Sequence, residues 1–397
     1  MAIKEWVLTD HSCGLWVENL NLDENDIGIP NCRVNKRQLH GGLSEGVDIV
    51  EIKSGETELV VVPTRGMSIR KAAYRGKQLG WKSPVRGPVH PQFIIPSERG
   101  GLGWLRGFDE WIVRCGLDYN GAPGVDTVLD NNGNTVTVQL DLHGKIANIP
   151  AHYVKLIADT EREILQIQGI VDESALFHPS LSLKTSITVS PHSSRITVAD
   201  TIVNNQSTSA ELELLYHCNF GPPFMNENSR IVLPFHSIAP RDQRACENIG
   251  NTKEEALTKI TSCPGPTKGY IEQVYFCKPA SLPNDSATLA ALVNSKAEHA
   301  AVIRYNSAQL PCLTLWKNTA SENEGYVVGI EPATDYPNCR PVEREAGRVI
   351  SLSPGESYTT QLMFEIAEGE EAVTNVLAEI AQIQDEASGE INLTPIE

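Results

Sequence analysis

Short stretches of alternating hydrophobic and polar residues, or of clustered β-branched residues, recur along the whole chain. They lie at residues 47–53, 58–63, 135–142, 164–171, 181–189, 195–203, 211–216, 300–304 and 313–316. Clusters of Pro, Gly and Asn separate them, as turns separate the strands of an antiparallel sheet. The pattern therefore predicts an all-β fold built from many short strands.

Helical periodicity is confined to two segments. In residues 370–386 the hydrophobic positions share one face of a helix, and a shorter helix is predicted at residues 253–260. Strands and helices do not alternate, so the pattern does not indicate a nucleotide-binding fold of parallel strands. The glycine-rich residues 100–107 also fail the dinucleotide-binding pattern, because Arg106 stands where the third glycine belongs.

The chain carries no sign of division into separate domains. No linker rich in Ser, Gly or Pro interrupts it, and no internal repeat is apparent. We therefore predict a single domain over residues 1–397. It would include an N-terminal extension at about residues 1–45 and a C-terminal helix at about residues 370–386.

Composition and charge narrow the choice of partners. The chain has 397 residues, of which 41% are hydrophobic, and this is enough to bury a large core. Its 33 basic and 50 acidic residues give a formal net charge of -17, which repels phosphate backbones and anionic lipid surfaces. We therefore expect neither nucleic acid nor a membrane as partner. No signal-peptide pattern or membrane span is apparent, which predicts a cytoplasmic location.

The cysteines indicate a reducing compartment. There are nine, an odd number, and no two form a Cys-x-x-Cys pair. This favours reduced thiols over a disulfide framework. Structural zinc sites use closely spaced pairs of ligands, so no metal is expected.

Three polar residues stand at the ends of predicted strands: His143, His217 and Glu331. His143 precedes Gly144, which lets the chain turn away from the imidazole. His217 closes an apolar strand, where burial lowers its pKa and a carboxylate neighbour raises it. Glu331 ends another apolar strand, a costly place for a carboxylate unless it is paired or functional. Each also has a structural interpretation: a turn histidine, a satisfied core histidine, and an ion-pair partner for an arginine.

The order and spacing of these three residues resemble the aldose 1-epimerase (galactose mutarotase-like) superfamily. His143 and His217 are 74 residues apart, and His217 and Glu331 are 114 apart. Residues 143–148 (HGKIAN) are similar to the family's His-Gly-Phe-Ala-Arg-Asn segment. Further similarity, to an uncharacterised bacterial branch of unknown function often labelled "aldose 1-epimerase family", lies at residues 63–67, 107–110, 114–117 and 240–242. The resemblance covers residues 46–365.

The resemblance implies a fold and a reaction. The fold is a galactose mutarotase-like antiparallel β supersandwich with few short helices. The reaction interconverts the anomers of a sugar, with Glu331 as the base that takes the anomeric proton and His217 as the acid that protonates the ring oxygen. It needs no cofactor and no metal. The two catalytic groups should converge on one cleft with His143, Arg65 and Arg106.

The resemblance also suggests residues that bind the sugar, although this chain departs from the family pattern at several positions. The predicted binding residues are Arg65, Arg106, Asp109, His143, Asn219, Asp242, Glu272 and Trp316. Typical members follow the acid histidine with Pro-Tyr-Phe-Asn, whereas this chain has Cys218-Asn219-Phe220. The aspartate that contacts the sugar in galactose-active relatives has two candidate matches here, Asp242 and Glu272. These departures predict a remodelled sugar pocket.

Other functions remain open from the sequence. One is a non-catalytic sugar-binding or sensing protein on the same fold, and another is a sugar isomerase or epimerase acting at a different carbon. Glycoside hydrolysis needs a second carboxylate, for which no partner of Glu331 is evident. The presence of both His217 and Glu331 favours an enzyme over a non-catalytic sugar-binding protein. Arginines 65, 70, 106 and 114 and Lys145 leave a sugar with an anionic group possible. The oligomeric state is open.

Overall fold

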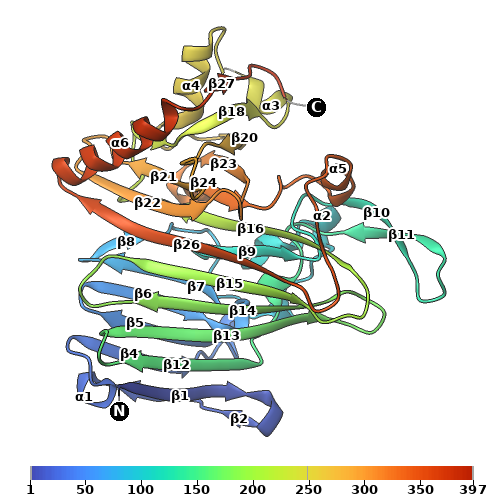
Figure 1. Ribbon diagram of the computed structural model, residues 1–397, viewed down its shortest axis with the longest axis vertical. Helices are drawn as coiled ribbons and strands as arrows, with labels where there is room; N and C mark the ends of the chain where they lie inside the picture. The colour runs from blue at the N-terminus through green and yellow to red at the C-terminus, as the bar shows by residue number, and fades with distance from the viewer. Residues whose placement is uncertain (1, 248, 396–397) are drawn as a thin grey trace.

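Two large β-sheets lie face to face and form the body of the protein (Figure 1). The computed structural model describes residues 2–247 and 249–395 of the chain. Neighbouring strands pair antiparallel, apart from a short parallel contact between β18 (Phe235–Pro240) and β27 (Glu390–Ile391). The predicted all-β antiparallel supersandwich is confirmed.

The first sheet has 11 strands among the described residues. In spatial order they are β19 (Ser262–Cys263), β17 (Ser229–Val232), β21 (Ala287–Val293), β22 (His299–Asn306), β26 (Ser357–Glu368), β15 (Ile196–Asn204), β14 (Ser180–Val189), β13 (Ile164–Ser174), β12 (Tyr153–Asp159), β1 (Ile3–Asp10) and β2 (Leu15–Trp16). The strands predicted within residues 164–203 form its centre.

The second sheet has 14 strands in the described part of the chain. In spatial order they are β27, β18, β20 (Gln273–Pro279), β23 (Cys312–Thr319), β24 (Tyr326–Ala333), β16 (Ala210–Phe220), β9 (Ile112–Leu117), β7 (Ser68–Tyr74), β6 (Thr57–Val62), β5 (Asp48–Ser54), β4 (Cys32–Gln38) and β3 (Leu20–Leu22), with β25 (Ile350–Leu352) beside β16 and β8 (Lys77–Leu79) beside β7. The N-terminal 45 residues thus supply β1 and β2 to the first sheet and β3 and β4 to the second.

The helices are few and lie at the periphery. Those described are α1 (Glu24–Ile27), α2 (Glu98–Gly101), α3 (Gln243–Cys246), α4 (Lys253–Thr261), α5 (Arg340–Glu345) and α6 (Glu370–Gln384). The two predicted helices correspond to α4 and α6. In α6 the predicted apolar face is buried, since Val373, Val376 and Ile380 pack against β21 and β22.

Strand alternation gives the two faces of the 14-stranded sheet different surroundings. Leu214 and Tyr216 of β16 and Ile330 of β24 point into the core between the sheets. Successive side chains of a strand point to opposite faces. His217 and Glu331 therefore share the outer face of the sheet.

Loops cover this outer face and keep it from solvent. Trp104, in the short 3₁₀ helix Gly103–Gly107, and Phe108 pack against Val113 and Leu215 in one apolar cluster. Both faces of β16 are consequently buried, and nearly all of its side chains are inaccessible. This explains why the sequence of β16 is an almost continuous apolar run instead of a strict alternation.

A buried ion pair joins the two sheets on the inner side. Arg114 of β9 donates to Asp200 of β15 from Nη2 at 2.9 Å, and the Tyr216 hydroxyl donates to the same carboxylate at 2.6 Å. Arg114 is the cross-strand partner of Tyr216, so its side chain faces the core. It lies on the opposite side of the sheet from His217.

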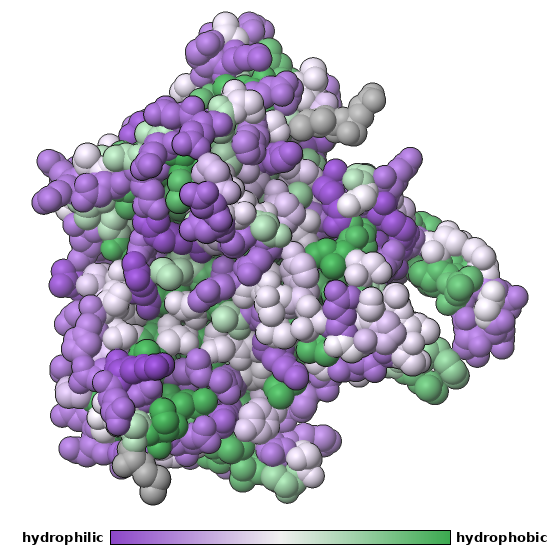
Figure 2. Space-filling view, viewed as in Figure 1, coloured by the Kyte–Doolittle hydropathy of each residue, from purple (hydrophilic) through white to green (hydrophobic). Residues whose placement is uncertain are grey.

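The hairpin of β10 (Gly124–Leu129) and β11 (Thr135–Leu140) forms a separate 2-stranded sheet that stands out from the sandwich (Figure 1). Its exposed residues include Val125 and Leu129, and hydrophobic surface is visible on this projection (Figure 2). Within the described ranges, no helix has the length and apolar character needed to cross a lipid bilayer.

Candidate active site

His217 and Glu331 meet on adjacent strands. β16 and β24 pair antiparallel with Leu215 opposite Ala333 and Asn219 opposite Gly329, a register that puts His217 opposite Glu331. The His217 Nδ1 atom lies 3.2 Å from Glu331 Oε1. Residues far apart in the chain thus form one cross-strand pair, as the predicted acid and base require.

Asn219 determines which nitrogen of His217 carries a proton. Its amide nitrogen donates to the carbonyl oxygens of Glu110 at 3.0 Å and His217 at 3.2 Å, so its Oδ1 atom must face the imidazole. Oδ1 accepts from His217 Nδ1 at 2.7 Å. The proton of the neutral ring is therefore on Nδ1, and the lone pair on Nε2 is free to accept another.

His143 approaches His217 from a tight turn. The two rings are 5.5 Å apart and nearly perpendicular. His143 has a φ of 61° and Gly144 one of 68°, and a Cβ at Gly144 would lie 2.1 Å from the Tyr119 carbonyl oxygen. Only glycine therefore fits at position 144. His143 Nδ1 donates to the Asn120 carbonyl at 2.8 Å, and burial lowers the pKa of His143 to about 4.

Aromatic rings enclose the His217–Glu331 pair. The His217 ring lies 4.8 Å from that of Phe108, 5.2 Å from that of Trp316 and 6.2 Å from that of Trp104. Only 5% of His217 and 2% of Glu331 remain exposed. Apolar walls of this kind exclude water and strengthen any electrostatic interaction within them.

Burial acts on the two partners in opposite directions. It lowers the pKa of His217 well below the usual value, with a contribution from His143. It raises the pKa of Glu331 well above the usual value, with a contribution from the Glu272 carboxylate. Although 3.2 Å would suit an ion pair, these directions favour a neutral carboxyl beside a neutral imidazole, and the Nδ1 proton points to Asn219. Apart from the Nδ1 proton held by Asn219, the pair has one transferable proton, which either the Glu331 carboxyl or His217 Nε2 can carry.

Three buried polar atoms at this place lack a hydrogen-bond partner within the described residues. They are Glu331 Oε1, Trp104 Nε1 and Oγ1 of Thr314, the residue opposite Glu331 on β23. Buried polar groups are nearly always satisfied, and an exception calls for an explanation such as a ligand. An acceptor and a donor left free beside one imidazole suit the hydroxyl groups of a sugar.

A polar rim borders the pair beside Trp316. The Trp316 Nε1 atom donates to Glu272 Oε2 at 2.7 Å, and Glu272 lies 4.0 Å from Arg241. Arg241 also donates to Asp242 at 2.8 Å, while Asp242 caps α3 by accepting from the Ala245 backbone at 2.9 Å. Trp316, Glu272 and Asp242, predicted separately, therefore lie within one chain of contacts.

The remaining predicted residues lie behind or beside the pair. Arg65 is fully buried, and its guanidinium donates to Glu110, Asn148 and the Gly107 carbonyl. Arg65 therefore supports the site indirectly. It holds the side chain of Glu110, and the backbone carbonyl oxygen of Glu110 accepts from Asn219.

Asp109 accepts from Arg70 at 2.7 Å. Arg106 is largely exposed and pairs with Glu98. The structure therefore brings His143, His217, Asn219 and Glu331 together, and it leaves Arg106 outside.

Several residues of the site escaped the sequence analysis. Phe108, Glu110 and Asn120 hold or enclose the two histidines, yet they lie in loops without a periodic pattern. The available signal was their place in the chain: Phe108 and Glu110 lie within the motif residues 107–110, and Asn120 follows residues 114–117. Over the described ranges, no group of three or more His, Cys, Asp and Glu side chains is arranged to hold a metal ion.

The fold defines a galactose mutarotase-like protein, and comparison with solved structures agrees. A candidate aldose 1-epimerase from Klebsiella pneumoniae subsp. pneumoniae MGH 78578 is 34% identical, with 100% of this chain and 99% of that chain covered and a TM-score of 0.91. A galactose mutarotase-like protein from Clostridium acetobutylicum is 16% identical, with coverage of 84% and 98% and a TM-score of 0.57. The second likeness shows the fold alone.

The family follows from the sequence comparison. The family described as "Domain of unknown function (DUF4432)" matches residues 44–366, and this chain belongs to it. The predicted membership of the galactose mutarotase-like superfamily is confirmed. A search of curated proteins found no match.

Proposed function

We propose that the protein is an aldose 1-epimerase, which interconverts the anomers of a monosaccharide through His217 and Glu331. The observation that carries this proposal is the 3.2 Å separation of His217 Nδ1 and Glu331 Oε1 on one enclosed face of the sheet. Two proton-transfer groups in contact, with no third ionisable group between them, are what opening and closing a sugar ring requires.

The chemistry matches a pair that holds a single proton. In ring opening, a base takes the proton of the anomeric hydroxyl while an acid protonates the ring oxygen. Both oxygens are bonded to the same carbon, so adjacent acid and base groups can reach them together. In closing on the other face the two groups exchange roles, and the proton count of the pair is unchanged.

The protonation state of the His217–Glu331 pair lets it work over a wide range of pH. The transferable proton rests on Glu331, because burial raises the pKa of the carboxyl and lowers that of His217. Whether the sugar meets this form or the form with the proton on His217, one group can give and the other can accept. By itself, the pair would lose activity when it gains a second transferable proton at low pH or loses its transferable proton at high pH.

The surroundings of the pair favour a neutral sugar. The arginines that could clamp an anion are already paired with carboxylates: Arg65 with Glu110, Arg70 with Asp109, Arg114 with Asp200 and Arg241 with Asp242. The Trp316 and Phe108 rings offer apolar faces, and Glu272 offers a carboxylate for hydroxyl groups. The free thiols found at all nine cysteines suit a reducing compartment such as the cytoplasm.

The test is anomer exchange measured by one-dimensional proton NMR over a panel of neutral and acidic sugars. Glu331→Gln keeps the shape of the side chain but cannot shuttle a proton, so exchange should fall about 10² to 10⁴-fold with sugar affinity retained. His217→Asn should act similarly. Glu58→Gln, on the exposed side of β6 with Lys53 as partner, is the matched control.

Each other outcome points to a different function. Full exchange by Glu331→Gln would mean that another residue is the base. A wild-type protein that binds sugars without exchanging their anomers would be a sensing protein. New sugar signals in the spectrum would identify an epimerase acting at a different carbon.

A further inference from the structure

A second cross-strand pair lies on the same face of the sheet, beside the catalytic one. The register that puts His217 opposite Glu331 also puts Glu213 of β16 opposite Asp335, just beyond β24. Both carboxyl groups are completely buried. Two acidic residues facing each other in a sheet are destabilising if both are charged.

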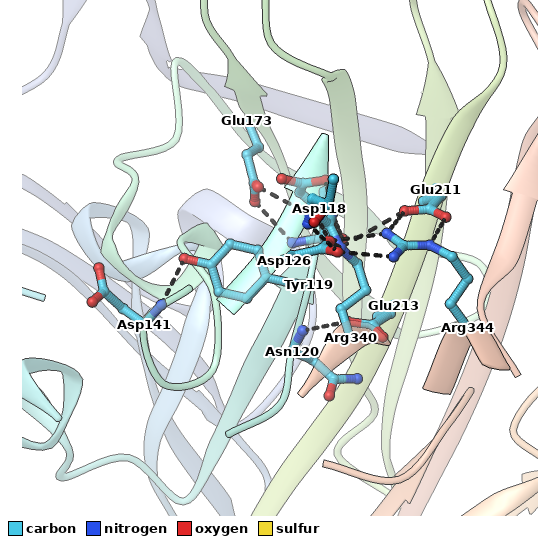
Figure 3. A network of polar contacts seen from close by, with 12 residues as sticks. Asp118, Tyr119, Asn120, Asp126, Asp141, Glu173, Glu211, Glu213, Arg340 and Arg344 are labelled. Carbon is cyan, nitrogen blue, oxygen red and sulfur yellow. Dashed lines mark hydrogen bonds and ion pairs between the residues drawn. The ribbon is translucent and has the colours of Figure 1, made fainter. Parts of the chain in front are cut away.

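Asn120 links these two carboxyl groups to His143. The Asn120 backbone nitrogen donates to Glu213 Oε2 at 3.0 Å, a contact drawn in Figure 3. Its side-chain nitrogen donates to Asp335 Oδ1 at 2.8 Å. Its carbonyl oxygen accepts from His143 Nδ1 at 2.8 Å. The orientation of the His143 ring therefore depends on a residue whose own place is set by the two carboxyl groups.

The oxygens at this place lack donors. Glu213 Oε1, Asp335 Oδ2 and Asn120 Oδ1 are buried and have no hydrogen-bond partner within the described residues. All three are acceptors, so what is missing is a hydrogen. A proton on one carboxyl group supplies it and lets that group donate to the other.

The neighbouring charges do not replace that proton. From α5, Arg340 is held by Asp118 and Asp126, and Glu343 is held by Arg348. Figure 3 shows Arg340 beside Asp118 and Asp126. Other titratable groups nearby include the thiols of Cys312, on β23, and Cys339, and the phenol of Tyr336. Burial raises the pKa of Glu213 to about 7 and that of Asp335 well above its usual value. The Glu213 charge raises the pKa of Asp335 further, whereas a hydrogen bond with Asp335 lowers that of Glu213, as expected if Asp335 carries the proton and donates it to Glu213.

We propose that Glu213 and Asp335 share one proton, and that this carboxyl pair positions His143 through Asn120. The positioning role rests on the proposed function, because it concerns the same site. When the shared proton leaves, two like charges face each other in a buried place and push the pair apart. Asn120 then loses its fixed position, and His143 loses the hydrogen bond that holds its ring.

The decisive variants are Glu213→Gln and Asp335→Asn. In either one an amide nitrogen donates permanently across the pair, and the amide oxygen still accepts from Asn120. The pair then needs no proton. Glu365→Gln, on β26 of the other sheet and paired with Arg195 and Arg304, is the control.

One arm of the experiment does not depend on catalysis. A buried carboxyl with a raised pKa contributes stability that is fully present below its unfolded pKa and is lost as the pH rises through the folded pKa. Unfolding by urea should therefore show Glu213→Gln gaining stability relative to wild type as the pH rises from about 5 through about 7. The NMR signal of the His143 Nδ1 proton should persist to higher pH in the variant. If stability and signal follow wild type at every pH, there is no shared proton.

The second arm tests the positioning role. The high-pH loss of kcat should move upward by about one pH unit or more in Glu213→Gln and Asp335→Asn, with KM little changed. If the pair were merely structural, the two variants would change the stability of the protein but leave the pH of the high-pH loss of kcat unchanged. That result would overturn the positioning role. Failure of the proposed function is distinguishable, because wild type would then show no exchange while the first arm still reports the shared proton.

Discussion

Gly329 leaves room for the carboxyl group of Glu331, and replacing it tests the geometry of the site. The two residues point to the same face of β24, and a Cβ at position 329 would lie 2.1 Å from Glu331 Oε1 and 3.2 Å from the Trp316 Cβ. The backbone of Gly329 does not have a positive φ, so alanine is conformationally allowed there. Gly329→Ala therefore changes the place of the carboxyl group and little else.

The expected magnitude follows from the contact distances. Ordinary contact between heavy atoms needs about 3.5 Å, so the carboxyl group must move by more than about 1 Å. A displacement of about 1 Å typically costs on the order of 100-fold in rate, equal to about 2.7 kcal/mol in the barrier. Crowding costs about 1–3 kcal/mol of stability, and the lower entropy of an unfolded alanine offsets about 0.5–1 kcal/mol of that.

The assay is anomer exchange by NMR, together with urea unfolding. Gly329→Ala should lose about 100-fold in kcat while remaining folded. Gly265→Ala is the matched control, because a Cβ there meets only the flexible side chain of Glu227, at 3.3 Å. If Gly329→Ala exchanges anomers at the wild-type rate although Glu331→Gln does not, the position inferred for the reactive carboxyl group is wrong.

Two further predictions concern stability. Arg114→Met should lower the free energy of unfolding by about 3–5 kcal/mol, because it leaves the buried Asp200 carboxylate without its cation; a loss below about 1 kcal/mol in urea unfolding would contradict this. Burial and the nearby Asp118 charge raise the pKa of Glu173 to about 7. The protonated form stabilises the fold below the unfolded pKa, and that stability is lost as the pH rises toward about 7, so Glu173→Gln should become more stable than wild type by up to about 3 kcal/mol near pH 8. Equal pH dependence in the two proteins would refute it.

Much of the fold was predictable because it depends on local patterns. Alternation and turn residues located the central strands, and hydrophobic residues that share one helical face located α6. His217 and Glu331 were recognisable because a histidine and a carboxylate at the ends of apolar strands are costly unless they have a role. Their order along the chain then indicated the superfamily.

The sequence alone could not say which face of a strand its polar residues would occupy, or what would cover it. Arg65 and Arg114 were candidates for binding an anion, yet both guanidinium groups are buried in ion pairs. Both faces of β16 are covered, so its apolar run does not reveal which side chains face the core and which face the site.

The contact of His217 with Glu331, and that of Glu213 with Asp335, was decided by tertiary structure. Both depend on the register of β16 against β24, two strands more than a hundred residues apart. A shift by one residue would turn every side chain to the other face. The positions of Asn120 and Asn219 likewise come from loops and strands that meet only in the folded protein. The sequence by itself determined which residues are costly to bury, and the tertiary structure determined which of them share a proton, because proton sharing depends on distances that only the folded chain sets.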